Sequence, residues 1–356
     1  MPLGTFRTRY ENWSRTPALV VLAGLLICLA IVSWSPSSAP SPKLRTSPAV
    51  QNDLSLYRDV IAGVAAGGGY YEVAAREHRA GNYPVRPFYT FRLPTLATLY
   101  ATVGERVMLY LLWLLGAGLL FAWWIRLHPL LPLPLLGGAM VMLAGGIGGL
   151  MQPVTGIFHE SWAAILMSLM IAIHRPGRVW PAIVAGTAAL MIRELALPMI
   201  LAMAGIALVE KHWREAAAWS AVVLVFAAYM ALHAGWVAEV VRPGELASQG
   251  WSRMLGGQFA LKSIAKVTLG IRLPDALAAG LLILSLFGWA SVRADWAVRA
   301  ALLLTGYYVM LALFARADTF YWALLAAPLS FVGLVFVPTA LADLARAIRV
   351  VPQPSP

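Results

Sequence analysis

The chain has 356 residues, of which 60% are hydrophobic and 12% are charged, and its mean hydropathy is +0.73. These values exclude an ordinary soluble domain and are typical of a polytopic membrane protein. The net charge of +11 is spread over many short loops, which fits topology signals and anionic lipid headgroups better than a nucleic-acid surface. The single cysteine, Cys28, excludes a disulfide framework and a metal centre held by thiolates.

The N-terminal region begins with several arginines, which are followed by an apolar run at 17–34. This run is long for a signal peptide, and Pro40 would follow the cut at the nearest cleavage-like site. We therefore expect residues 1–16 to be cytoplasmic and residues 17–34 to form an uncleaved first transmembrane helix.

Residues 35–104 form a polar segment that we expect outside the membrane. Its first part, 35–48, is a Pro/Ser-rich tether with too little apolar content to pack. The pattern over 54–80 is that of an amphipathic helix, interrupted by three glycines at 67–69. Such a helix can lie in the plane of the lipid headgroups.

The sequence after residue 104 predicts a transmembrane bundle over 105–341 and a cytoplasmic tail over 342–356. A second cationic outer segment is expected at 238–275. With the first helix, the predicted spans number ten. The nine that follow it are 107–125, 131–151, 161–173, 179–192, 195–209, 216–237, 276–292, 298–314 and 320–341.

Basic residues occupy every second turn of this arrangement, as the positive-inside rule requires of cytoplasmic turns. The predicted cytoplasmic turns hold Arg126, then Arg175 with Arg178, Lys211 with Arg214, Arg293 with Arg299, and finally Arg346 with Arg349.

An adjacent pair, Arg193 and Glu194, stands in the middle of the apolar run 179–209. Ionisable residues at membrane depth mark sites that face protein or water. Basic clusters flank both ends of the run, so one crossing would place one cluster on the wrong side. We expect two short helices, up and back, of about 15 residues or roughly 23 Å each. The alternative is one long tilted helix with a buried structural ion pair.

Carboxylates, arginines and histidines gather at the expected outer face. This mixture suits transfer from a phosphate-activated donor, because a carboxylate can deprotonate a hydroxyl while arginine holds the leaving phosphate. Each also has a plainer interpretation: a charge on a wet helix face, an anchor for lipid headgroups, or an acid favoured by a helix dipole. The group comprises Asp53, Asp59, Glu72, Arg76, Glu77, His78, Arg79, Arg86, Arg92, His159, Glu160, Arg193, Glu194, Arg316 and Asp318.

Three stretches give the chain a family resemblance. The first is the long outer loop, with an early acid in Tyr57-Arg-Asp59, followed by Gly69-Tyr-Tyr71, Gly81-Asn-Tyr-Pro84 and Arg92-Leu-Pro94. The second is the sequence Phe158-His-Glu160 at the head of a span, and the third is the hinge at Arg193-Glu194. In these the chain resembles the polytopic GT-C glycosyltransferases, which use polyprenyl-phosphate sugars on the outer side of the membrane. The resemblance implies an all-α protein with about ten transmembrane helices and a long outer loop that carries amphipathic interfacial helices.

The resemblance also implies roles for individual residues. Asp59 would be the general base, with Asp53 and Glu72 as alternatives, and Glu160 a second catalytic acid. The substrate- and phosphate-binding residues would be Arg193, Glu194, Arg79, Arg86, Arg92, His159 and Glu72.

The implied reaction moves a sugar from a polyprenyl-phosphate donor to a lipid, polysaccharide or protein acceptor. The implied location is the bacterial inner membrane, with the active face toward the periplasm. No metal site is predicted from the residues, no cofactor is identified with certainty, and dependence on a divalent cation stays open. The alternative function is a transporter or flippase for a lipid-linked or anionic substrate, because broken helices with polar hinges also build transport sites.

Overall fold

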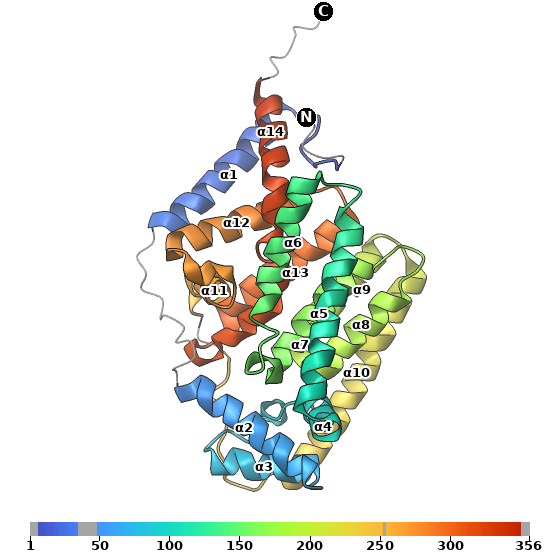
Figure 1. The fold of residues 1–356 in the computed structure, drawn as a ribbon, viewed down its shortest axis with the longest axis vertical. Coiled ribbons are helices and arrows are strands. Elements are labelled where there is room, and N and C mark those ends of the chain that lie inside the picture. The colour runs from blue at the N-terminus through green and yellow to red at the C-terminus, as the bar shows by residue number, and fades with distance from the viewer. Residues whose placement is uncertain (1–5, 35–47, 252–253, 350–356) are drawn as a thin grey trace, which may run out of the picture.

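A computed structural model describes residues 6–34, 48–251 and 254–349 (Figure 1). The described chain is helical, with two isolated bridges and no strand, which confirms the expected all-α class. The predicted tether over 35–47 and the last residues of the predicted tail, 350–356, lie outside the described residues.

The α-helices follow one another along the chain with short connections. They are α1 Arg15–Trp34, α2 Pro48–Ala65, α3 Tyr70–Ala80, α4 Pro94–Val103, α5 Glu105–Leu127, α6 Leu133–Gly148, α7 His159–Ile173, α8 Trp180–Ile192, α9 Leu197–Val209, α10 Trp213–Val240, α11 Gly256–Lys266, α12 Asp275–Ser291, α13 Asp295–Phe314 and α14 Val337–Arg349. The 3₁₀ segments are η1 Phe88–Thr90, η2 Thr155–Ile157, η3 Glu194–Ala196, η4 Leu269–Arg272, η5 Ala317–Leu329 and η6 Val332–Phe336.

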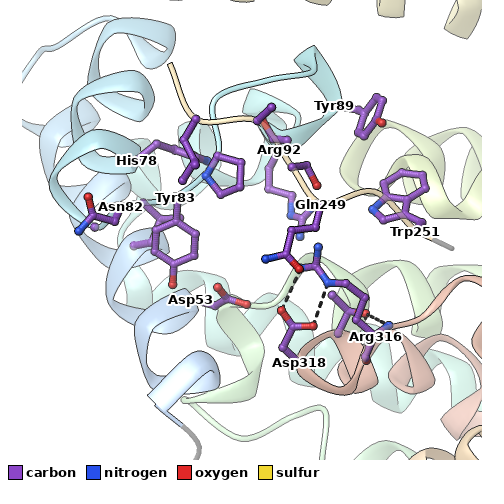
Figure 2. Close-up of a pocket in the computed structure, with 18 of the residues that line it drawn as sticks. Asp53, His78, Asn82, Tyr83, Tyr89, Arg92, Gln249, Trp251, Arg316 and Asp318 are labelled. Atoms are coloured by element: carbon purple, nitrogen blue, oxygen red, sulfur yellow. Dashed lines mark hydrogen bonds and ion pairs between the residues drawn. The ribbon is translucent and has the colours of Figure 1, made fainter. Parts of the chain in front are cut away.

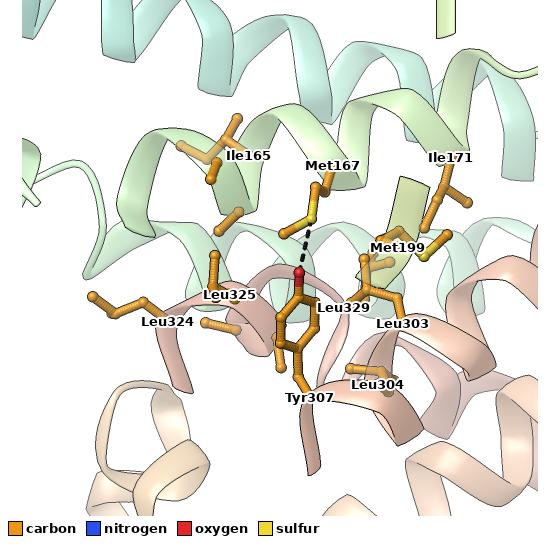
Figure 3. Packing of buried hydrophobic residues seen from close by; sticks show 14 of the residues in the cluster. Ile165, Met167, Ile171, Met199, Leu303, Leu304, Tyr307, Leu324, Leu325 and Leu329 are labelled. Atoms are coloured by element: carbon orange, nitrogen blue, oxygen red, sulfur yellow. Dashed lines mark hydrogen bonds between the residues drawn. The ribbon is translucent and has the colours of Figure 1, made fainter. Parts of the chain in front are cut away.

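Several of these elements suit a lipid bilayer. In the described chain, five helical segments are long and apolar enough to cross a membrane, and five shorter apolar helices accompany them. Large apolar side chains project from the bundle surface, where Leu114 and Leu224 are each 70% exposed. Exposed apolar surface of this kind is costly in water and favourable against lipid tails. Inside the bundle, apolar side chains of α7, α9, α13 and η5 pack together around Tyr307 (Figure 3). The architecture is that of a helical membrane protein.

The apolar run 179–209 is divided, as its flanking charges predict. Helix α8 ends at Arg193, whose backbone is extended (φ −140°, ψ 113°), and α9 begins after the single turn η3. A Cβ on Gly186 would lie 2.9 Å from Ile200 Cδ1, so residues on either side of the hinge are neighbours. The chain therefore reverses direction here, and the alternative of one long tilted helix is wrong.

The predicted basic turns gather at one end of the bundle, which we call the basic end. Arg126 Nε donates to the Ala172 carbonyl at 3.0 Å, and His174 Nε2 lies 2.7 Å from a Glu215 carboxylate oxygen. There, Arg299 also pairs with Glu210 at 3.4 Å. This is the upper end of the molecule in Figure 1, where the N-terminus and α14 lie.

The opposite end, which we call the cavity end, is built by α2, α3, α4 and the segment 241–251 (Figure 1). Helices α2 and α3 are separated at Gly67, which has a positive φ of 90° that favours glycine. They bury a small apolar cluster that includes Leu56, Val60 and Val73, and the end of α10 packs against it through Val237. This layer forms a cap over the ends of the longer helices.

Two glycines bring α12 and η6 into backbone contact, as small residues do at membrane-helix interfaces. A Cβ on Gly288 would lie 1.9 Å from the Gly333 carbonyl oxygen. We expect Gly288→Ala to lower the free energy of unfolding by about 1–3 kcal/mol, because the two segments must separate. The melting temperature in detergent measures this. The control is Gly280→Ala on the same helix, where the nearest atom, Leu29 Cδ2, is 3.8 Å away. Equal melting temperatures for the two variants would contradict the close packing.

Candidate functional site

A cavity of about 440 Å³ opens at the cavity end. Four parts of the chain line it: α2, the stretch 78–92, the segment 246–251 and the start of η5. Figure 2 shows the side chains that project into it. Among those that bear on chemistry are Asp53, Tyr57, Tyr83, Arg92, Arg316, Asp318 and Tyr321.

Helix α2 presents Asp53 to this cavity. Leu56 and Tyr57 are buried on the same helix, three and four residues after Asp53, and residues at these spacings share a helix face. Burial raises the pKa of the Asp53 carboxyl above its usual range. The hydroxyls of Tyr83 and Tyr321 lower this pKa in part, and Tyr83 points toward the carboxylate in Figure 2.

Asp59, the base implied by the family resemblance, lies elsewhere. It is exposed, and it is not among the residues that line the cavity. Asp59 lies six positions after Asp53. In an α-helix with 3.6 residues per turn, this spacing rotates the Asp59 side chain about 240° around the helix axis relative to Asp53. The geometry therefore favours Asp53, one of the alternatives left open by the sequence.

Among the arginines of the described stretch 48–104, Arg92 is the one that lines the cavity. Its Nε donates to the Tyr57 hydroxyl at 3.0 Å, and its Nη2 donates to the Tyr321 hydroxyl at 3.4 Å. Its Nη1 lies 3.8 Å from a Glu194 carboxylate oxygen. These contacts hold the guanidinium between α2, η5 and the hinge.

Beneath Arg92 lies the hinge pair predicted from the sequence. The Arg193 side chain is 1% exposed, and its Nε lies 2.8 Å from the fully buried carboxylate of Glu160. Arg193 also forms an ion pair with Glu194 through Nη1. Two arginines and two carboxylates thus alternate in the order Glu160, Arg193, Glu194, Arg92, a balanced arrangement that limits the cost of burying charge.

The other predicted phosphate-binding arginines contact the segment 241–248 instead of the cavity. Arg79 pairs with Glu245 and donates to the Val240 carbonyl at 2.6 Å. Arg86 Nε donates to the Glu245 carbonyl at 3.0 Å. Both side chains therefore anchor a loop that forms one wall of the cavity.

Two further predicted residues lie at the margins of the site. Glu72 is exposed in the first turn of α3 and does not line the cavity. His159 is buried, and its ring centroid lies 5.3 Å from that of Tyr57, so it supports α2 from below.

The aromatic residues of the cavity, above all Tyr83, Tyr321 and Trp322, were not predicted from the sequence as site residues. Tyrosine and tryptophan are abundant at membrane interfaces, so composition alone gives these positions no distinct signal. A weak signal was available for Tyr83, which lies between Gly81 and Pro84 in a stretch that the family resemblance already pointed to.

In the described parts of the chain, no three His, Cys, Asp or Glu side chains are placed to hold a metal ion together. Comparison of the chain with family models, curated proteins and solved structures gives no match. The function of the protein must therefore be inferred from the geometry of the cavity.

Proposed function

We propose that the chain is a membrane glycosyltransferase that moves a sugar from a polyprenyl-phosphate donor to a hydroxyl of a lipid, polysaccharide or protein acceptor. The observation that carries the proposal is a half-buried carboxylate, Asp53, which faces the same cavity as the fixed guanidinium of Arg92. A base beside a cation is what displacement of a phosphate by a hydroxyl requires.

In this mechanism Asp53 takes the proton from the acceptor hydroxyl. The acceptor oxygen then bonds to the anomeric carbon of the sugar, and the bond from that carbon to the phosphate oxygen breaks with its electron pair on the phosphate. Arg92 stabilises the negative charge of the departing polyprenyl phosphate. Arg193 acts as a positioning residue, because it holds Glu194, which in turn lies against Arg92.

The raised pKa of Asp53 supports its role as a base. A general base is most effective when its pKa lies near the working pH, and an unperturbed aspartate is too weakly basic for this. Burial shifts the Asp53 pKa in the useful direction. Since the deprotonated form is the active one, the rate should fall as the pH falls through this raised pKa.

Tyr83→Phe tests this pH dependence. The Tyr83 hydroxyl lowers the Asp53 pKa, so its removal should raise that pKa further. We expect the acid limb of the rate profile to move to higher pH, with little change of rate on the plateau. The matched control is Tyr71→Phe, because the Tyr71 hydroxyl contacts His233 at 3.0 Å and does not line the cavity. An acid limb that stays in place in both variants would remove Asp53 from the role of base.

The orientation in the membrane is part of the proposal. The basic end carries the turns that the positive-inside rule assigns to the cytoplasm. The cavity end then faces the periplasm of a bacterial inner membrane, where lipid-linked sugars and envelope acceptors meet.

Purified protein in detergent gives the direct test. Sugar transfer from a host lipid extract to an envelope acceptor fraction should proceed in detergent without any ion or proton gradient. A transporter would instead leave every glycosidic bond intact and would act only in sealed, energised vesicles. The absence of any new glycosidic product in detergent would overturn the proposal.

A further inference from the structure

The cavity has a second side, away from Asp53, that the mechanism above does not use. Tyr89 and Trp251 lie there with ring centroids 4.8 Å apart, and Trp322 meets Trp251 edge to face at 5.6 Å. Figure 2 shows Asp53 and Tyr83 on one side of the cavity and Tyr89 with Trp251 on the other. We call Tyr89, Trp251 and Trp322 the aromatic wall.

The aromatic wall is held in place by backbone contacts. Val85 N–H donates to the Leu246 carbonyl at 3.0 Å, and Ser248 N–H donates to the Arg86 carbonyl at 2.7 Å. These bonds fasten the segment that carries Trp251 to the stretch that carries Tyr89. A fixed aromatic surface loses little conformational entropy when a ligand packs on it.

Polar groups border this wall. Arg316 and Asp318 form a forked pair, with Nε to Oδ1 at 3.0 Å and Nη2 to Oδ2 at 2.9 Å. Three side-chain groups on the cavity-lining residues are buried with no hydrogen-bond partner among the described residues: the Tyr83 hydroxyl, which points toward Asp53, the Thr90 hydroxyl and Trp322 Nε1–H. Trp322 is 3% exposed, and buried polar atoms are nearly always satisfied, so an unpaired N–H beside a cavity indicates a ligand contact.

The chemistry of these groups discriminates between ligands. An acyl chain would cover the aromatic rings, but it would leave the unpaired buried groups unsatisfied and would place hydrocarbon against the charged Arg316–Asp318 pair. A phosphate would be repelled by Asp318 and would gain nothing from the ring faces. A sugar ring matches both halves, because its C–H face packs on aromatic rings while adjacent hydroxyls donate to a carboxylate and accept from a guanidinium or an indole N–H.

We propose that the aromatic wall and the Arg316–Asp318 pair form a subsite for a pyranose ring. The inference rests on the proposed function for its biological meaning, since the ring belongs either to the donor or to the acceptor. The binding itself does not depend on catalysis, so a neutral glycoside should bind at this subsite without any turnover.

Saturation-transfer difference NMR tests this binding on the purified full-length chain in detergent. The probes are methyl hexopyranosides and methyl pentopyranosides, each added singly. At least one should receive saturation, strongest at the C–H groups of one ring face. Trp251→Ala should reduce this signal about fivefold or more, as truncation of a central aromatic contact does. Trp251→Phe should retain most of it, because phenylalanine preserves a ring face.

The control variant is Trp180→Ala, which removes the same side chain from a 61% exposed position at the start of α8. Its signal should equal that of the wild type. If no glycoside receives saturation, or if Trp251→Ala and Trp180→Ala give equal signals, the subsite is refuted. Addition of host lipid extract then distinguishes the two sources: displacement of the glycoside assigns the ring to the donor, and persistence assigns it to the acceptor.

Failure of the subsite and failure of the proposed function are separable. Asp53→Asn should keep the glycoside signal while it loses sugar transfer. Glycoside binding that depends on Trp251, in a wild-type protein that forms no glycosidic product, would overturn the proposed function and leave the subsite standing.

Discussion

Asp53→Asn is expected to lower the rate of sugar transfer by about 10²–10⁴-fold, the usual contribution of a positioned general base. Asparagine keeps the size of the side chain but cannot take the proton from the hydroxyl of the sugar acceptor. Single-turnover transfer in detergent, with enzyme in excess over donor lipid, measures the chemical step. The melting temperature of the variant should stay close to that of the wild type, because the change removes a charge from a half-buried position and leaves the packing intact.

Asp59→Asn is the matched control for that experiment. It makes the same substitution on the same helix, on an exposed face outside the cavity. We expect a transfer rate equal to that of the wild type. The reverse pattern, with Asp59→Asn inactive and Asp53→Asn active, would return the base to Asp59 and contradict the site described here.

Arg193→Ala is expected to destabilise the protein by about 3–5 kcal/mol, because removal of one partner leaves buried carboxylates without compensation. Glu160 is fully buried, and Glu194 would keep only its longer contact to Arg92 at 3.8 Å. Unfolding in detergent measures the loss, and sugar transfer should fall with it. Arg7→Ala is the control, since Arg7 and its partner Glu11 are 76% and 40% exposed, and exposed pairs contribute about 0–1 kcal/mol.

A combined variant separates charge compensation from packing at the hinge. Arg193→Met together with Glu160→Gln removes one charge of each sign at nearly constant volume and leaves Glu194 paired with Arg92. Such replacements of buried ion pairs are often neutral. Stability should recover while sugar transfer stays low. If Arg193→Ala and Arg7→Ala have the same melting temperature, Arg193 is not a structural charge partner.

The hinge at Arg193 could be predicted from the sequence because its causes are local. Basic residues on both flanks and an ion pair at the centre leave a membrane helix few alternatives. The same holds for the division between α2 and α3 at 67–69, where glycines interrupt an amphipathic pattern. Local composition and charge are sufficient for features of this kind.

The base could not be chosen in the same way. Periodicity shows that Asp53 and Asp59 lie on different faces of α2, but it does not say which face meets the rest of the protein. The face of α2 that carries Asp53 meets Tyr321, a residue far away in the sequence that lines the same cavity. The roles of the arginines could not be predicted from the sequence for the same reason. Arg79 and Arg92 have the same charge, and Arg79 is directed to a loop by its ion pair with Glu245, which is distant in the sequence.

The most direct test of the central claim is the glycan profile of a deletion strain of the native host, read by mass spectrometry of the cell envelope. We expect deletion to remove one sugar unit, which the wild-type chain restores and Asp53→Asn, at matched protein level, does not. Complete glycans that accumulate on their lipid carrier inside the cell would contradict a glycosyltransferase and indicate a transporter.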